Sequence, residues 1–157
     1  MIAQFLRWMS DEGLVNLDDI TKNNLDGFHT RFRIQKCMFI AQHLGLDAGY
    51  SYNRYKHGPY SPTLAKDYYG FANKKADVDK EFDFSEAAAC HDMMKHDNDW
   101  LEIGTTLIHA SKGHNSIDPL IEYVECIKYP YSRKYIESVF DDLRETKIAR
   151  IFDRLVV

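Results

Sequence analysis

The chain has 157 residues, of which 45% are hydrophobic and 28% charged, with only four prolines and eight glycines. These values are typical of an ordinary globular protein and exclude a disordered or fibrous chain. The length is typical of one domain, so we expect a single domain over residues 1–157. The net charge of −4 argues against a protein that coats nucleic acid nonspecifically.

Apolar residues at helical spacing, with capping and stop signals at the ends, predict a mainly α fold. In chain order the expected helices cover about residues 2–11, 30–44, 61–73, 85–96, 100–113, 118–129 and 132–143, and the apolar spacing continues over 148–155. Alternating tyrosines between Gly49 and His57 predict one strand. We therefore expect a compact multi-helix domain with one or two short strands.

The charge is unevenly distributed along the chain. Residues 29–75 carry a net charge of +6 and the remainder carries −10. The basic residues in this segment are Arg31, Arg33, Lys36, Arg54, Lys56, Lys66, Lys74 and Lys75. A docking face for an acidic partner and ordinary solvated helix faces both produce such a block, so both interpretations stay open.

This charge distribution divides the sequence into two halves. A basic N-terminal half ends near residue 75, and an acidic helical half begins near residue 85. Between them, residues 73–84 are charged and aperiodic, which predicts an exposed connection within one domain.

The cysteines and the apolar runs indicate the compartment. Cys37, Cys90 and Cys126 lie far apart among apolar neighbours, which predicts reduced thiols in the core. No apolar run reaches the roughly 18 residues of a membrane span, and the N-terminal segment is acidic where a signal peptide would be apolar. The expectation is a cytoplasmic protein with no membrane partner.

Motifs for metal binding and catalysis are missing from the sequence. His91 and His96 are five residues apart, whereas the zinc motif H-E-x-x-H needs a spacing of four, and the sequence has no Cys-x-x-Cys pair. It also has no G-x-S-x-G elbow, no P-loop and no dinucleotide fingerprint. We therefore predict no metal, no cofactor and no catalytic residue. One enzymatic alternative stays open, in which His57 works with a carboxylate such as Asp67.

The densest chemical feature lies between Tyr50 and Phe71, where aromatic and basic residues alternate. Such a mixture is typical of nucleic-acid or protein interfaces, and equally of half-buried tyrosine packing. The sequence His57-Gly-Pro-Tyr-Ser61 predicts a rigid turn displaying a histidine and a tyrosine. The predicted partner-binding residues are Arg54, Tyr55, His57, Gly58, Pro59, Tyr60 and Ser61. The predicted basic face consists of Arg31, Arg33, Lys36, Lys56 and Lys66.

These segments resemble a protein family. The helix from Arg31 to Gly45, with Ile34-Gln35-Lys36, followed by Tyr55 to Leu64, is similar to the motifs of YwgA-type proteins and SocA-like Panacea domains. In that family an "LQK" helix leads to a "GP-y-S-x-x-L" turn. Phe39 departs from the pattern, because a tyrosine is common at that position. The resemblance implies a compact α-rich, winged-helix-like fold and an association with antitoxins that neutralise diverse toxins.

The leading hypothesis is therefore a non-enzymatic regulatory binding protein, antitoxin-like, that docks a protein partner such as a toxin. The first alternative is a DNA-binding transcriptional regulator that places the basic segment 29–75 on phosphates. The second is a small enzyme with the His57 site. Apolar stripes on the last helices leave a homodimer open.

Overall fold

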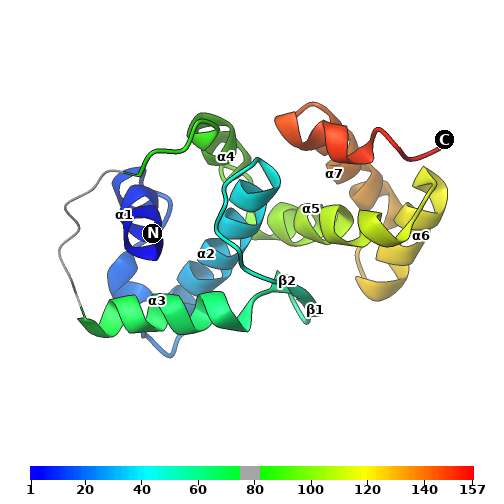
Figure 1. Cartoon of the computed structure of the whole chain (residues 1–157). Helices are drawn as coiled ribbons and strands as arrows, with labels where there is room; N and C mark the ends of the chain where they lie inside the picture. The colour runs from blue at the N-terminus through cyan, green and yellow to red at the C-terminus, as the bar shows by residue number, and fades with distance from the viewer. Residues whose placement is uncertain (75–81) are drawn as a thin grey trace. The chain divides into compact units, whose positions relative to one another are not determined.

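The computed structural model describes residues 1–74 and 82–157 (Figure 1). The described residues are mainly helical, with one two-stranded sheet, which confirms the predicted mainly α fold with short strands. By their contacts the residues form two units. The first comprises Met1–Asn53 and Tyr60–Lys95, and the second comprises Arg54–Pro59 and His96–Val157. The division therefore falls after Lys95 rather than in the expected connection at 73–84, of which 75–81 lie outside the described residues.

The first unit is built around one long helix. Its elements are α1 (Ile2–Asp11), the 3-10 turn η1 (Leu17–Asp19), α2 (Leu25–His43), α3 (Pro62–Lys74) and α4 (Ala87–Met93). Helix α2 packs on α3, α4 and η1, and α1 packs on α3. The ring of Phe82 lies against Phe5 and Trp8 of α1. These ring contacts explain why the chain just before α4 belongs to this unit.

Helix α2 is buried on all sides over residues 32–41, and this burial includes polar side chains. Gln35 receives a hydrogen bond from the Ser61 backbone N–H and donates one to the Ser61 carbonyl, each at 2.9 Å. Arg33 donates to the carbonyl of Met94. A buried polar group is costly unless it has a partner, so these bonds explain how a central helix tolerates them.

Two of the three cysteines lie in the core of the first unit. The sulfur atoms of Cys37 on α2 and Cys90 on α4 are 3.6 Å apart, and both residues are fully buried. Cys126 is exposed, so the prediction of a third core thiol was wrong. Its helix turns this position away from the apolar stripe of Leu120, Ile121 and Val124.

The second unit contains three packed helices, α5 (Asn98–Ala110), α6 (Ile117–Ile127) and α7 (Arg133–Arg144). Asp97 and Ser132 cap α5 and α7 by accepting hydrogen bonds from N–H groups of the first turn. The 3-10 turn η2 (Ser111–Gly113) follows α5, and η3 (Lys147–Phe152) packs on α7. The predicted helical tail is thus a 3-10 turn.

The sheet is a hairpin of β1 (Asn53–Tyr55) and β2 (Gly58–Tyr60). The single strand predicted over 49–57 is therefore two short strands joined by Lys56 and His57. Gly58 has a φ of +96°, a conformation that a side chain would strain. The glycine after His57 thus permits the chain to reverse.

Two helix boundaries also differ from the predictions. Helix α2 begins at Leu25 rather than near residue 30, because Asn24 caps it by accepting a hydrogen bond from the N–H of Gly27. Helix α4 covers Ala87–Met93 rather than 85–96. In the described part of the chain, no helix has the length and apolar character needed to cross a membrane.

Candidate functional site

The hairpin tip, residues 54–59, belongs to the second unit and carries most of the predicted partner-binding residues. The side chains of Arg54, Tyr55, Lys56 and His57 are exposed, with Tyr55 at 47% of its full accessible area. Polar and aromatic side chains at a tight turn present a compact contact surface. Gly58 and Pro59 are buried beneath it.

A buried ion pair supports this tip. Lys128, which is only 6% exposed, donates through Nζ to the Glu102 carboxylate at 3.1 Å and to the Lys56 carbonyl at 3.0 Å. The second oxygen of Glu102 lies 3.4 Å from Nδ1 of His57. One lysine thus links helix α5, the end of α6 and the hairpin backbone, so the turn is held in place from within its own unit.

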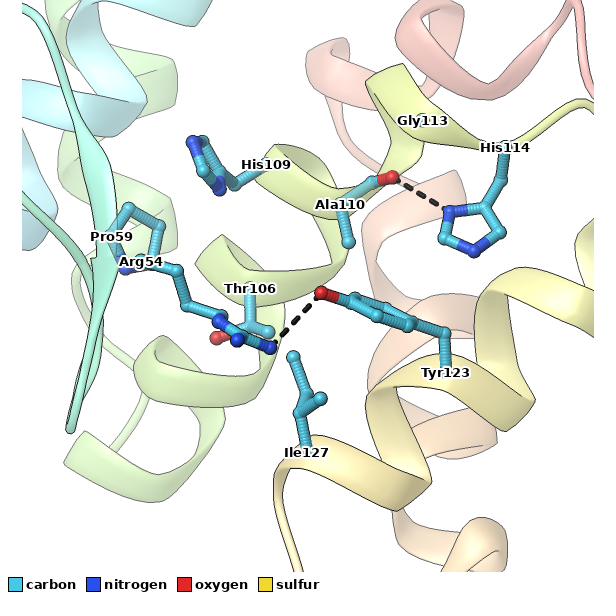
Figure 2. Close-up of a pocket in the computed structure, with 9 residues that line it drawn as sticks. All are labelled: Arg54, Pro59, Thr106, His109, Ala110, Gly113, His114, Tyr123 and Ile127. Atoms are coloured by element: carbon cyan, nitrogen blue, oxygen red, sulfur yellow. Dashed lines mark hydrogen bonds between the residues drawn. The ribbon is translucent and has the colours of Figure 1, made fainter.

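Beside the tip lies a pocket of about 480 Å³ within the second unit (Figure 2). Its nine lining residues come from the hairpin, from the C-terminal end of α5 with the turn after it, and from α6. Two of them, Arg54 and Pro59, are among the residues predicted from sequence. The remaining seven come from segments that no motif connects, so sequence reasoning missed them.

Arg54 and Tyr123 meet inside this pocket, as Figure 2 shows. Arg54 donates through Nη1 to the Tyr123 hydroxyl at 3.0 Å, and its guanidinium carbon lies 5.9 Å from the centre of that ring. His114 packs on the other side of the pocket, with its ring centre 5.1 Å from that of Tyr123. Its Nδ1 lies 2.9 Å from the Ala110 carbonyl oxygen, which favours a proton on Nδ1.

Tyr60 and Ser61 group with the first unit instead. Ser61 is fully buried, and its hydroxyl caps α3 by accepting a hydrogen bond from the Leu64 N–H at 3.2 Å. Because Ser61 also pairs with Gln35, its contribution is to structure. The prediction that Ser61 itself contacts a partner was wrong, since no solvent reaches it.

The predicted basic face does not form as a set. Arg33 is 9% exposed and Lys36 is 2% exposed, with the Lys36 ammonium 5.0 Å from the centre of the Phe32 ring. The prediction was wrong for these two residues, because a central helix buries both. Arg31 is half-buried and donates through Nη1 to the carbonyls of Ile20 and Lys22, each at 2.8 Å.

Two other predicted cations, Lys56 and Lys66, are exposed, but they belong to different units. The predicted set of five is therefore reduced to its solvent-exposed or half-buried members, Arg31, Lys56 and Lys66. These cations are close together in the sequence because the long helix and the hairpin follow one another along the chain.

His57 and Asp67, the pair considered for catalysis, have different partners. His57 faces Glu102, whereas Asp67 accepts a hydrogen bond from the Tyr50 hydroxyl at 2.6 Å. Burial and this hydrogen bond raise the pKa of Tyr50 above its ordinary value. The carboxylate beside His57 is therefore Glu102, which lies 45 residues away along the chain and which no sequence pattern connects to the histidine.

Among residues 1–74 and 82–157, no three His, Cys, Asp or Glu side chains are grouped closely enough to hold a metal ion. Comparisons of the whole chain with protein-family models, with curated proteins and with solved structures find no match.

Proposed function

We propose that this protein is a non-enzymatic regulatory binding protein, antitoxin-like, which docks a protein partner through its hairpin tip. One observation carries the proposal: exposed Arg54, Tyr55 and His57 stand on a turn whose backbone is held by buried Lys128. Tyrosine and arginine contribute disproportionately to protein interfaces. A turn that is ordered before binding loses less conformational entropy on association, which favours affinity.

The surroundings of His57 favour binding over catalysis. A general base needs a carboxylate or imidazole that is free to take a proton from a substrate. The carboxylate beside His57 already accepts a hydrogen bond from Lys128 at 3.1 Å, and that lysine neutralises its charge. The arrangement therefore fixes the turn and the Nδ1 side of the histidine.

The DNA-binding alternative has less support from the described residues. Phosphate contacts need cations that solvent reaches, and Arg33 and Lys36 are buried. The two hypotheses also differ in their response to salt, because counterion release makes binding to nucleic acid weaken steeply as salt increases. A protein interface centred on tyrosine depends less on ionic strength.

The test is an affinity pull-down from the native cell extract at low and high salt, with the tagged full chain. The Tyr55→Ala/His57→Ala variant removes two exposed side chains of the tip and leaves the Lys128–Glu102 ion pair in place. Tyr69→Ala is the matched control, because Tyr69 is an exposed tyrosine on α3 with 39% of its area accessible. Circular dichroism spectra and melting curves of all three proteins check the fold.

We expect one protein to persist at high salt with the wild type and with Tyr69→Ala, and to be lost with the tip variant. Recovery of nucleic acid alone, removed by salt, would replace the proposal with the DNA-binding alternative. Equal recovery of the protein by all three chains would show that the tip is not the docking surface.

A further inference from the structure

The pocket beside the hairpin tip has the dimensions and the charge of a small-ligand site. Its volume of about 480 Å³ lies within the range of about 300–1,000 Å³ usual for small-molecule sites. All its lining residues belong to the second unit, so it is complete within that unit. Ligand binding in this pocket is independent of the proposed partner docking.

The polar groups of the pocket favour an anion. Arg54 reaches into the pocket, and its side chain donates a hydrogen bond to the Tyr123 hydroxyl, which fixes the direction of the guanidinium. Among the described residues, no carboxylate lies within ion-pair distance of Arg54, and no acidic residue lines the pocket. His109 also lines the pocket, whereas the Nδ1 proton of His114 is directed to the Ala110 carbonyl. A guanidinium matches a carboxylate with two parallel hydrogen bonds.

Much of the remaining lining is apolar. Pro59, Ala110 and Ile127 line the pocket together with the ring of Tyr123, and the hydroxyl of Thr106, which also lines it, donates to the Glu102 carbonyl. Such walls favour an organic ligand with a compact apolar body, because burial of that body removes apolar surface from water. An inorganic anion would leave these walls without a contact.

The helix end at the pocket disfavours a doubly charged phosphate more than a singly charged carboxylate. Phosphate sites typically use the N–H groups at a helix N-terminus. Here Ala110 is the last residue of α5, so the pocket meets the C-terminal end, where carbonyl oxygens face outward and the helix dipole is negative. A doubly charged phosphate is repelled there more strongly than a carboxylate.

We propose that this pocket binds a small organic monocarboxylate with a compact aromatic or branched apolar body, whose carboxylate pairs with Arg54. The ligand lies against Pro59 and Ile127, and binding involves no covalent step. Because Arg54 and Pro59 belong to the hairpin tip, a ligand bound in the pocket also contacts the tip.

The experiment is a titration of the isotope-labelled full chain, followed by amide NMR shifts. The probes are phenylacetate and its neutral analogue phenylacetamide, which has nearly the same shape and no charge. We expect phenylacetate to shift amides of residues 106–114 and 123–127 and to bind at least about tenfold more tightly than the amide, a difference that one charged hydrogen-bonded pair supplies.

Three variants test whether Arg54 and the pocket are responsible for the binding. Arg54→Gln should abolish the preference for the acid, whereas Arg133→Gln, on α7 and away from the pocket lining, should keep it. Ala110→Leu retains Arg54 and fills the cavity, so it should remove binding of both probes. The amide spectrum of each variant in the absence of ligand shows whether the fold is retained.

Equal affinity for acid and amide, shifts outside the pocket, or no saturation up to about 10 mM acid would overturn the proposal. A third probe distinguishes binding of a free small acid from binding of the C-terminal carboxylate of a peptide. If the dipeptide acetyl-Gly-Phe with a free C-terminus binds about tenfold more tightly than phenylacetate, the occupant is a peptide carboxylate and the small-acid proposal is wrong.

Discussion

At the scale of single residues, the structure shows that chemical type does not decide exposure in this protein. Lysine and arginine are mostly surface residues, yet Lys36 and Lys128 are 2% and 6% exposed. Each lies beside a specific group, the ring of Phe32 for Lys36 and the carboxylate of Glu102 for Lys128. The consequences of this burial can be measured at single positions.

The thiols give the first prediction. Burial raises the pKa of the Cys37 thiol, and Cys90 is equally enclosed, whereas Cys126 is exposed. Since the thiolate is the reactive form, we expect a disulfide reagent at pH 8 to modify Cys126 rapidly in the native protein. The other two thiols should react only after unfolding in guanidinium chloride. Rapid modification of the Cys126→Ser variant under native conditions would contradict this assignment.

The ion pair below the hairpin gives the second prediction. Lys128→Met leaves the Glu102 carboxylate, whose side chain is 14% exposed, without its main partner. We expect a loss of roughly 2–4 kcal/mol in the free energy of unfolding, because an unpaired charge in a poorly solvated place is costly. Urea denaturation of the variant and of the wild type measures this difference in the free energy of unfolding.

Two further variants separate charge from packing in this experiment. The double variant Lys128→Met/Glu102→Leu should recover most of the loss, because no buried charge remains. Lys134→Met, at an exposed position on α7, should change stability by less than about 0.5 kcal/mol. If the double variant is as unstable as Lys128→Met, the ion pair is not the origin of the effect.

At the scale of elements, the start of α2 depends on a close backbone approach. A Cβ atom on Gly27 would lie 1.9 Å from the Lys22 carbonyl oxygen, which also accepts the hydrogen bond from Arg31. The loop before α2 therefore packs directly on the first turn of the helix. This contact explains why the helix begins several residues before its apolar stripe.

Two glycine substitutions test that contact. Gly27→Ala should lower the free energy of unfolding by about 1–3 kcal/mol, since the loop has to move. Gly70→Ala is the matched control, because Gly70 lies inside α3 with no atom within 4 Å of a new Cβ, and it should stabilise by about 0.5–1 kcal/mol. Thermal and urea unfolding measure both. Equal effects of the two substitutions would contradict the close approach at Gly27.

At the scale of the whole molecule, stability should depend on pH through tyrosines that are buried or half-buried. Burial is the main cause that raises the pKa of Tyr50, Tyr52 and Tyr68 above the ordinary value of 10.0. The hydroxyl of Tyr52 is buried with no hydrogen-bond partner among the described residues. These groups resist ionisation in the folded state and ionise normally in the unfolded state.

The sign of the effect follows from proton binding. Above pH 10 the unfolded state releases phenol protons that the folded state retains, so the stability that these groups contribute is present below pH 10 and is lost as the pH rises further. We expect the free energy of unfolding to fall progressively between pH 10 and pH 11.5 in urea titrations. Tyr52→Phe should show a shallower fall and no loss of stability at pH 7, because it removes an unpartnered hydroxyl.

Tyr69→Phe, at an exposed position, is the control for general effects of alkaline solution and should follow the wild-type curve. If Tyr52→Phe and Tyr69→Phe fall with the same slope as the wild type, Tyr52 is not among the groups that couple stability to pH.

Local patterns in the sequence were sufficient to predict most helices and the position of the turn at Gly58. Helix α1 is predicted to its terminal residues, because the stripe of Phe5, Leu6 and Met9 and the following Gly13 are local signals. The start of α3 at Ser61-Pro62 and the turn at Gly58 follow equally from local backbone preferences.

Only the tertiary structure shows which side chains are buried, which groups contact one another and where the pocket lies. Whether Lys36 faces solvent depends on how many elements pack around α2, and the carboxylate beside His57 is Glu102 because folding brings distant segments together. The pocket joins Arg54, Ala110 and Tyr123, which lie far apart in the chain. Periodicity and capping act over a few residues, whereas such contacts depend on the packing of whole helices, which no local pattern encodes.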